Sequence, residues 1–207
     1  MLYIIGVAHR AQARKQGADS TEAQTALTQS LERAIDLVRP AFIGEEACEE
    51  TLECRQEISI VKEVADKHVI RHMFCDPSRE KRQAIGYRNL QSIEMELVMR
   101  DKRGLWSEEI RNKARAIEIG RYFGIREQFW LERLDAHLDL DGIFVCGDLH
   151  IENPSFRRLL EHNNIPCEVL ERRIGVTKDD EPYYVALRYL EEHPEVIELV
   201  NEKPTHR

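Results

Sequence analysis

The sequence lacks any apolar run long enough to cross a membrane. Its N-terminal apolar run, residues 2–7, is far shorter than a membrane span or the apolar part of a secretion signal, and no positively charged leader precedes it. The usual marks of an exported or membrane-inserted chain are therefore missing. We expect a cytoplasmic protein that does not bind membranes.

An excess of positive charge is also lacking. The chain has 30 Lys and Arg residues against 38 Asp and Glu residues, which gives a net charge of -8. Nucleic acids and anionic membranes are bound through a positive field, so we expect neither as a partner. The 33% charged and 42% hydrophobic fractions are typical of a globular protein. We expect one domain over residues 1–207, with an oligomeric state that the sequence leaves open.

No two of the five cysteines form a Cys-x-x-Cys pair, which excludes the common zinc and redox motifs built on that spacing. An odd number of widely spaced cysteines favours reduced thiols. Cys75 and Cys146 lie inside apolar runs, where a thiol is usually a small core residue. We interpret both as part of the core.

The sequence contains several short apolar runs without alternating polar residues, and helix-like stretches separate them. Such runs suit strands that are covered on both faces, and they predict an α/β fold with a mainly parallel central sheet and helices on both faces. A helical insertion over about residues 77–140 is expected to cover the sheet or to form a lid. The expected strands lie at residues 2–7, 41–44, 68–75, 142–146 and 166–170.

Local signals predict where the helices begin. Asp19 and Glu22 are spaced like a capping pair, which predicts a first helix after Asp19 that ends at Pro40. Asp76 and Asn153 each precede a proline and are expected to cap a helix. Further helices are expected over residues 49–66, over 107–138 with a break near Gly120 and Gly124, over 182–192, and after Pro194.

Titratable residues follow four of the expected strands. Ligands of an open parallel sheet bind outside the carboxyl ends of its strands, which makes these residues the first candidates for a site. Two histidines sit in the same motif, Gly-x-x-His, and a carboxylate lies between them in the sequence. Such a set supplies either a general acid and base or most of the ligands of a metal ion. The residues are His9, Glu45, Glu46, Asp76 and His150.

The ordered set of motifs resembles a known superfamily, which groups erythromycin esterases, haem-binding ChaN proteins, TraB-like proteins and TIKI metalloproteases. Its members share paired Gly-x-x-His motifs, a glutamate that closes the second strand, and an arginine early in the helix before the last motif. The resemblance covers residues 1 to about 170. The matching segments here are Gly6-Val7-Ala8-His9, Phe42-Ile43-Gly44-Glu45-Glu46, Gly124-Ile125-Arg126-Glu127-Gln128 and Gly147-Asp148-Leu149-His150.

The adjacent glutamates depart from this pattern. Successive strand side chains point to opposite faces, so we expect only one of Glu45 and Glu46 to face the site. We favour Glu45 slightly and retain Glu46.

The resemblance implies a hydrolase that acts on a small or peptide-like substrate. His9 or His150 would activate a water molecule, Glu45 or Glu46 would orient it, and Arg126, beside Glu127, would hold the developing oxyanion. In a metal-dependent version, His9, Glu45 and His150 would ligate zinc, manganese or cobalt, which lowers the pKa of bound water. The alternative is a non-catalytic protein that binds haem or a metal.

Several residues near these motifs are candidates for substrate binding. Arg10 and Arg14 follow His9 and would meet an anionic group of the substrate, unless they only form a solvated basic loop. Asp76 and Asp148 are further candidates. The helix expected at Asn153 would add a positive dipole end. We interpret His68 and His72 as surface residues, and Trp106, Tyr122 and Trp130 as part of the cover of the sheet or of a lid.

Overall fold

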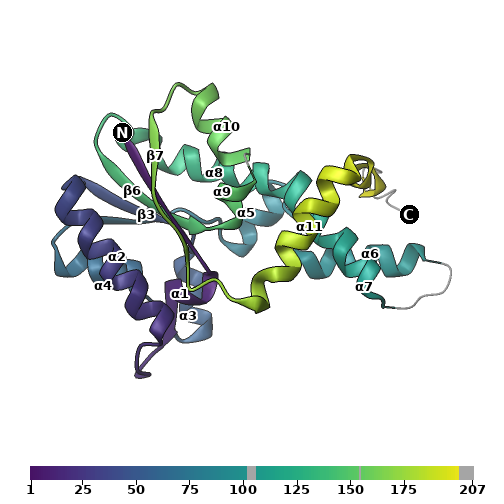
Figure 1. Cartoon of the computed structure of the whole chain (residues 1–207), viewed down its shortest axis with the longest axis horizontal. Helices are drawn as coiled ribbons and strands as arrows, with labels where there is room; N and C mark the ends of the chain where they lie inside the picture. Colours follow the sequence, from purple (N-terminus) through teal and green to yellow (C-terminus); the bar gives the residue numbers. More distant parts are fainter. Residues whose placement is uncertain (102–105, 154, 201–207) are drawn as a thin grey trace.

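Five parallel strands form a sheet at the centre of the computed structural model, which describes residues 1–101, 106–153 and 155–200 (Figure 1). The strand order is β5-β3-β6-β1-β7, and every neighbouring pair is parallel. The α/β class with a parallel sheet is thereby confirmed. The strands are β1 (Leu2–Val7), β3 (Phe42–Glu45), β5 (Arg71–Phe74), β6 (Gly142–Gly147) and β7 (Cys167–Ile174).

Helices cover both faces of this sheet, because both faces of the strands carry apolar side chains. On one face, α2 (Glu22–Val38) and α4 (Ile60–Lys67) pack against a cluster that includes Ile5 and Ile43. On the other, α8 (Phe123–Leu134) and α10 (Ser155–His162) pack against a cluster that includes Ile4 and Phe144. The alternation of Ile4 and Ile5 between the two clusters follows the two-residue period of a strand.

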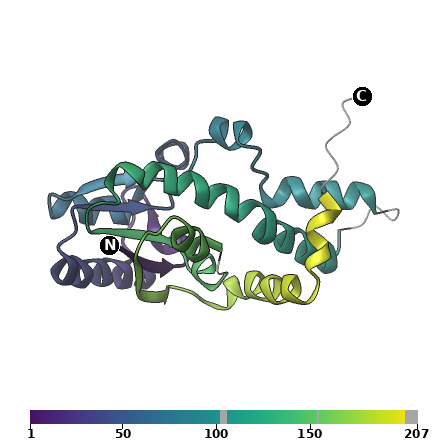
Figure 2. The same cartoon turned by 90° about the horizontal axis from the view of Figure 1, so that it is seen from above.

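A helical arm, made of α6, α7, α11 and η4, extends beyond the sheet (Figure 1). It has its own apolar cluster, which includes Ile93, Ile110 and Ile117. Figure 2 shows α7, the π-helical segment η1 and α8 following one another as one rod from the arm to the sheet. The bounds are α6 (Leu90–Arg100), α7 (Glu108–Ile117), η1 (Glu118–Tyr122), α11 (Glu181–Glu192) and η4 (Pro194–Val200).

The first two helices differ in detail from the expectation. Thr21 and Gln24 form the capping box of α2, in place of Asp19 and Glu22. The helix expected over residues 49–66 is divided, because Gln56 adopts a φ of 54° and ends its first part. The divided elements are α3 (Glu49–Arg55), β4 (Glu57–Ser59) and α4, and β4 pairs antiparallel with β2 (Ala13–Lys15).

Other predicted helix boundaries are wrong as well. Ser78, not Asp76, caps α5 (Arg79–Ala84). In contrast, the break predicted near Gly120 and Gly124 is present as the π-helical segment η1, which contains Gly120 and divides the stretch into α7 and α8. Of the pair predicted to cap α10, Pro154 lies outside the described residues and Asn153 ends α9 (Leu149–Glu152). The remaining short elements are α1 (His9–Gln12), η2 (Asp135–His137) and η3 (Lys178–Asp180).

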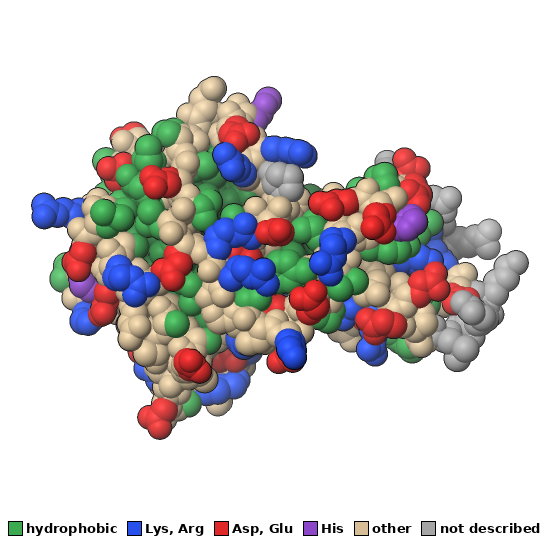
Figure 3. All heavy atoms as spheres, viewed as in Figure 1, with side chains coloured by type: hydrophobic (Ala, Val, Ile, Leu, Met, Phe, Trp, Pro, Cys, Tyr) green, Lys and Arg blue, Asp and Glu red, His purple; other side chains and the backbone are tan. Residues whose placement is uncertain are grey.

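The cysteines and the surface agree with the composition. All five cysteines are free, and Cys75 and Cys146 are buried, as expected of core thiols. On the face shown in Figure 3, basic and acidic side chains are interspersed rather than separated by sign. Among the described residues, no helix combines the length and apolarity that a membrane crossing requires.

The start of β6 gives a test of the packing. A Cβ on Gly142 would lie 2.1 Å from the ring of Phe42, whereas a Cβ on Gly124 would meet nothing within 4 Å. We expect Gly142→Ala to lower the free energy of unfolding by about 1–3 kcal/mol through overpacking. Gly124→Ala in α8, the matched control, should raise it by about 0.5–1 kcal/mol, since alanine favours helix. Urea unfolding measures both, and equal midpoints would contradict this packing.

Candidate active site

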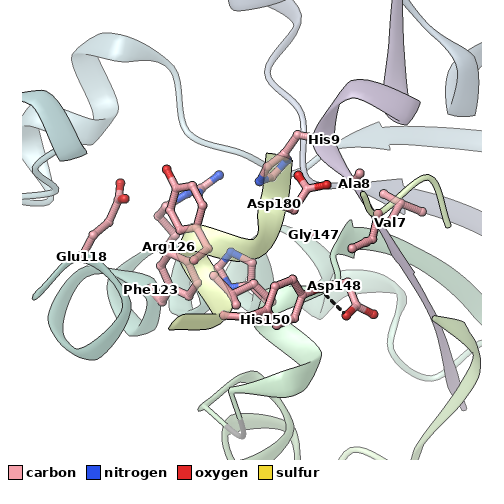
Figure 4. Close-up of a pocket in the computed structure, with 14 residues that line it drawn as sticks. Val7, Ala8, His9, Glu118, Phe123, Arg126, Gly147, Asp148, His150 and Asp180 are labelled. Atoms are coloured by element: carbon pink, nitrogen blue, oxygen red, sulfur yellow. Dashed lines mark hydrogen bonds between the residues drawn. The ribbon is translucent and has the colours of Figure 1, made fainter. Parts of the chain in front are cut away.

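Three adjacent strands bring two histidines and one glutamate together. In the sheet, β6 lies between β3 and β1, and the chain reaches Glu46 just after β3, His9 after β1 and His150 after β6. The Oε1 atom of Glu46 lies 3.8 Å from Nε2 of His9 and 3.4 Å from Nε2 of His150. Figure 4 shows both rings at one cavity. The carboxyl ends of these three strands therefore bring the three side chains together.

Glu46 is the centre of this arrangement. Its side chain is fully buried, its Oε2 accepts a hydrogen bond of 2.7 Å from the backbone N–H of Gly147, and its Oε1 lies 2.6 Å from Nη2 of Arg126. Burial opposes ionisation, but the charges of His150, Arg126 and His9 outweigh it and hold the pKa of Glu46 well below its usual range. Glu46 is thus a carboxylate at neutral pH.

The glycines of the two Gly-x-x-His motifs are required by close contacts. A Cβ on Gly147 would lie 3.1 Å from the ring of His9 and 3.2 Å from Oε2 of Glu46. A Cβ on Gly6 would lie 2.5 Å from Oδ1 of Asp148. In both motifs the missing side chain lets a carboxylate approach the backbone.

Glu45 points to the opposite side, so the preference for it over Glu46 is wrong. Its Oε1 accepts a hydrogen bond of 2.5 Å from Ser59 and lies 2.8 Å from Nε2 of His72. The set His9, Glu45 and His150 is therefore not brought together as metal ligands. His72 is 6% exposed in its side chain, which corrects its interpretation as a surface residue.

His150 is buried between two carboxylates. Its Nδ1 lies 2.7 Å from Oε1 of Glu127, its Nε2 faces Glu46, and its ring stacks on Phe123 at 3.9 Å. Burial lowers the pKa of His150, but Glu46 and Glu127 raise it to about 9 overall. His150 is consequently an imidazolium at neutral pH. Ser155, the first residue of α10, donates a 2.8 Å hydrogen bond to the same oxygen of Glu127.

Arg126 links Glu46 to a second carboxylate. Its Nε and Nη2 donate to Oδ1 of Asp76 at 3.0 and 2.8 Å, and Trp130 donates to the same oxygen at 3.2 Å. Asp76 is buried and also pairs with Arg82. It is a counter-ion for Arg126 rather than a helix cap, because the buried guanidinium needs compensation. Trp130 covers the sheet as expected, whereas Tyr122 is buried in the arm and Trp106 is exposed.

The two arginines expected to bind a substrate anion are already paired. Arg10 donates to the backbone oxygen of Gly175 and binds Asp180 at 2.9 Å, and Arg14 binds Glu63 at 2.7 Å. Arg14 also donates to the backbone oxygen of Ala18, away from the histidines. Acidic residues of the chain thus already neutralise both guanidiniums.

Asp148 forms hydrogen bonds with residues of β7 and α11. Its oxygens accept hydrogen bonds from the side chain of Arg172 at 3.1 Å, from the backbone N–H of Arg173 at 3.0 Å and from the hydroxyl of Tyr184 at 2.8 Å. Burial raises the pKa of Asp148, and these donors lower it below its ordinary value. Asp148 therefore anchors α11 at the rim of the site.

A cavity of about 150 Å³ opens above these residues. Its wall combines the strand ends with η1, α8 and α11, and includes His9, Glu118, Phe123, Arg126, His150 and Tyr183. Glu118, Tyr183 and Tyr184 were not predicted. Glu118 belongs to the π-helical turn and the tyrosines to the C-terminal helix, and no motif in the sequence marks any of them.

The donor set at Glu46 does not fit a divalent metal ion. The guanidinium of Arg126 lies 2.6 Å from the oxygen that faces both histidines, the backbone N–H of Gly147 donates to the other oxygen, and Glu127 lies 2.7 Å from Nδ1 of His150. A guanidinium and a divalent cation repel each other at one carboxylate oxygen. Within residues 1–101, 106–153 and 155–200, no group of three or more His, Cys, Asp or Glu side chains is placed to hold a metal. We therefore derive no step through a metal.

Comparison with known proteins adds no relative: no family model, no curated protein and no solved structure matches the chain. The resemblance of the motifs to the esterase and metalloprotease superfamily stays a prediction. Inferences about function therefore depend on the geometry of the site.

The placement of His150 predicts a pH dependence. Its pKa is raised above the value of about 6.5 expected in the unfolded chain, so its stabilising contribution is full below pH 6.5 and is lost as the pH rises through about 9. We expect Glu127→Gln to lower the pKa of His150 by roughly one pH unit or more, because one of its two carboxylates is removed. NMR titration of the imidazole nitrogens measures it.

Glu132→Gln is the matched control, since Glu132 is exposed on the same helix. An unchanged His150 titration in Glu127→Gln, or an equal shift in both variants, would contradict the assigned coupling.

Proposed function

We propose that this protein is a hydrolase that activates water between His9 and Glu46 and cleaves an ester or amide bond of a small or peptide-like substrate. One observation carries the proposal: a buried, ionised carboxylate faces two histidines of unlike environment at one cavity. Such pairs of unlike environment separate the roles of acid and base. The motif resemblance implies the same reaction class.

His9 is the general base in this proposal. Its side chain is 66% exposed, so substrate and water can reach it, and its Nε2 lies 3.8 Å from the carboxylate of Glu46. A neutral imidazole accepts the proton of water as the water oxygen forms its bond to the carbonyl carbon. Glu46 stabilises the imidazolium that results, and the imidazolium returns the proton to the leaving group as the bond to it breaks.

The two cations beside Glu46, His150 and Arg126, have different roles. His150 is already an imidazolium and its Nε2 makes no hydrogen bond to a described residue, which suits it to stabilise the oxyanion of the tetrahedral intermediate rather than to act as a base. Arg126 was expected to hold the oxyanion, but its Nε and Nη2 donate hydrogen bonds to Asp76 and its guanidinium lies against Glu46. We assign it to positioning Glu46. Glu127 positions His150 through the 2.7 Å contact with Nδ1.

The alternative expectation of a haem or metal carrier has less support. The guanidinium of Arg126 lies 2.6 Å from the carboxylate oxygen that a metal would need. No observation at the site favours binding without turnover.

Turnover of 4-nitrophenyl acetate, butyrate and benzoate tests the proposal. We expect His9→Ala and Glu46→Gln each to lower kcat/KM by roughly 10²–10⁴-fold, the usual contribution of general base catalysis. His162→Ala is the control, because His162 is an exposed histidine on α10 and reports the background reaction of surface imidazoles. Turnover by His9→Ala equal to that of the parent protein would refute the assignment of the base.

Chelation tests the metal-free form of the reaction. We expect dialysis against EDTA to leave kcat/KM of the same esters unchanged, because no step in the proposal uses a metal ion. Loss of turnover that zinc, manganese or cobalt restores would overturn this part of the proposal. Dialysis against buffer alone is the control.

A further inference from the structure

A second carboxyl group lines the cavity at a distance from the histidines. Glu118 is 7% exposed and belongs to the π-helical segment η1. In Figure 4 it lies on the far side of Arg126 and Phe123 from His9 and His150. The cavity therefore has an end at the two histidines and a separate end at Glu118.

Glu118 differs from the other carboxyl groups of the site because no charged partner binds it. It accepts a 2.9 Å hydrogen bond from the hydroxyl of Tyr87, and it forms no ion pair with any residue in the described part of the chain. Arg126 is held by Asp76 and Glu46, and Arg115, over the ring of Tyr183, pairs with Glu108. Arg126 and His150 therefore act on Glu118 only from a distance, and neither forms an ion pair with it.

The polar groups of the arm compensate Glu118 only in part: the hydroxyl of Tyr87 and the backbone N–H of Leu90 favour its ionised form, but burial outweighs them. The neighbours of Glu118 in the chain, Ile117 and Ile119, are buried apolar residues. Burying a carboxyl group without a charged partner costs free energy, and burial raises its pKa above the ordinary value. The π-helical turn that carries Glu118 is itself a rare conformation that is frequently found at functional sites. Both observations indicate a ligand.

Aromatic rings form the wall beside this carboxyl group. Phe123 and Tyr183 line the cavity, and burial together with the nearby charge of Glu118 raises the pKa of Tyr183 to about 12. Aromatic faces beside a carboxylate attract ammonium groups. The cavity volume of about 150 Å³ is that of a site for a group of benzene size.

We propose that Glu118 binds a primary ammonium group of the substrate, and that the substrate class is esters or amides whose acyl part joins the carbonyl carbon to an amine through a spacer of benzene size. The carbonyl end rests on the proposed hydrolase function, whereas the amine end rests on Glu118 and its surroundings. This replaces the anionic substrate expected from Arg10 and Arg14, which are paired elsewhere.

Binding of ketones without a leaving group tests the amine site apart from turnover. NMR titration of the intact protein gives the Kd of 4-(aminomethyl)acetophenone, 4-methylacetophenone and 4-acetylbenzoate. We expect the amine to bind roughly 10- to 100-fold more tightly than the methyl compound, the range of a hydrogen bond to a charged group, and the carboxylate most weakly. Equal Kd values for the amine and methyl ketones, or no binding of either, would overturn the proposal.

Glu118→Gln removes the charge and keeps an oxygen that accepts the hydrogen bond of Tyr87. We expect it to abolish the preference for the amine. Asp180→Asn is the matched control, because Asp180 lines the same cavity but is bound by Arg10 at 2.9 Å, and it should keep the preference. A preference that survives Glu118→Gln would refute the assignment. If that variant does not fold, the parent protein's ketone affinities still decide.

Methyl 4-(aminomethyl)benzoate and methyl 4-methylbenzoate separate the two proposals. We expect kcat/KM to favour the amine ester by the same factor in the parent protein and not in Glu118→Gln. If neither ester is cleaved but the amine ketone binds through Glu118, the hydrolase proposal fails and the amine site stands. If both esters are cleaved equally and the ketones bind equally, the amine site fails and the hydrolase stands.

Discussion

The site depends on one buried charge, the carboxylate of Glu46. A carboxylate taken out of water is unstable unless charged groups and hydrogen-bond donors replace the water. Here the guanidinium of Arg126, the backbone N–H of Gly147 and the imidazolium of His150 do so from three different elements. The need to stabilise this charge accounts for the arginine on α8 and for the glycine that closes β6.

The compensation extends outward from Glu46 in two directions. Arg126 is itself buried and needs Asp76, which also accepts from Trp130 and thereby fixes α8 on the sheet. His150 needs Glu127, which Ser155 holds at the start of α10. Negatively and positively charged side chains thus alternate from the strand ends to the helices that cover them. Residues that sequence motifs present as separate candidates are parts of one network.

The sequence was informative where strand geometry alone decides position. Unalternating apolar runs predicted the parallel sheet, and residues that follow such runs had to meet at its carboxyl edge, which placed His9, Glu46 and His150 correctly. The choice between Glu45 and Glu46 failed because alternation shows only that they face opposite ways, not which face holds the site. Glu45 shares its side of β3 with Ile43, which packs against α4, and this pairing exists only in the tertiary structure.

The roles of residues that are positioned by long-range packing could not be predicted from the sequence. Asp76 before a proline is a good helix cap by local rules, but the buried Arg126, 50 residues away, competes for its carboxylate and wins. Arg10 and Arg14 have the composition of an anion site, yet acids from distant segments neutralise both. Glu118 of η1 and Tyr183 of α11 line the same cavity because α11 packs beside η1.

Glu46 and Glu118 show how one residue type acquires opposite pKa shifts near one cavity. Both are buried, and burial disfavours the ionised form of each. Around Glu46 the surrounding charges exceed that cost, so its pKa falls and it can polarise a histidine. Around Glu118, the hydroxyl of Tyr87 and the already neutralised Arg126 do not outweigh the cost of burial. The pKa of Glu118 therefore rises, and its carboxyl group has no cation in direct contact among the described residues. The difference lies in the partners that each carboxyl group receives from the fold, and both proposals rest on it: the reaction on Glu46 and the amine site on Glu118.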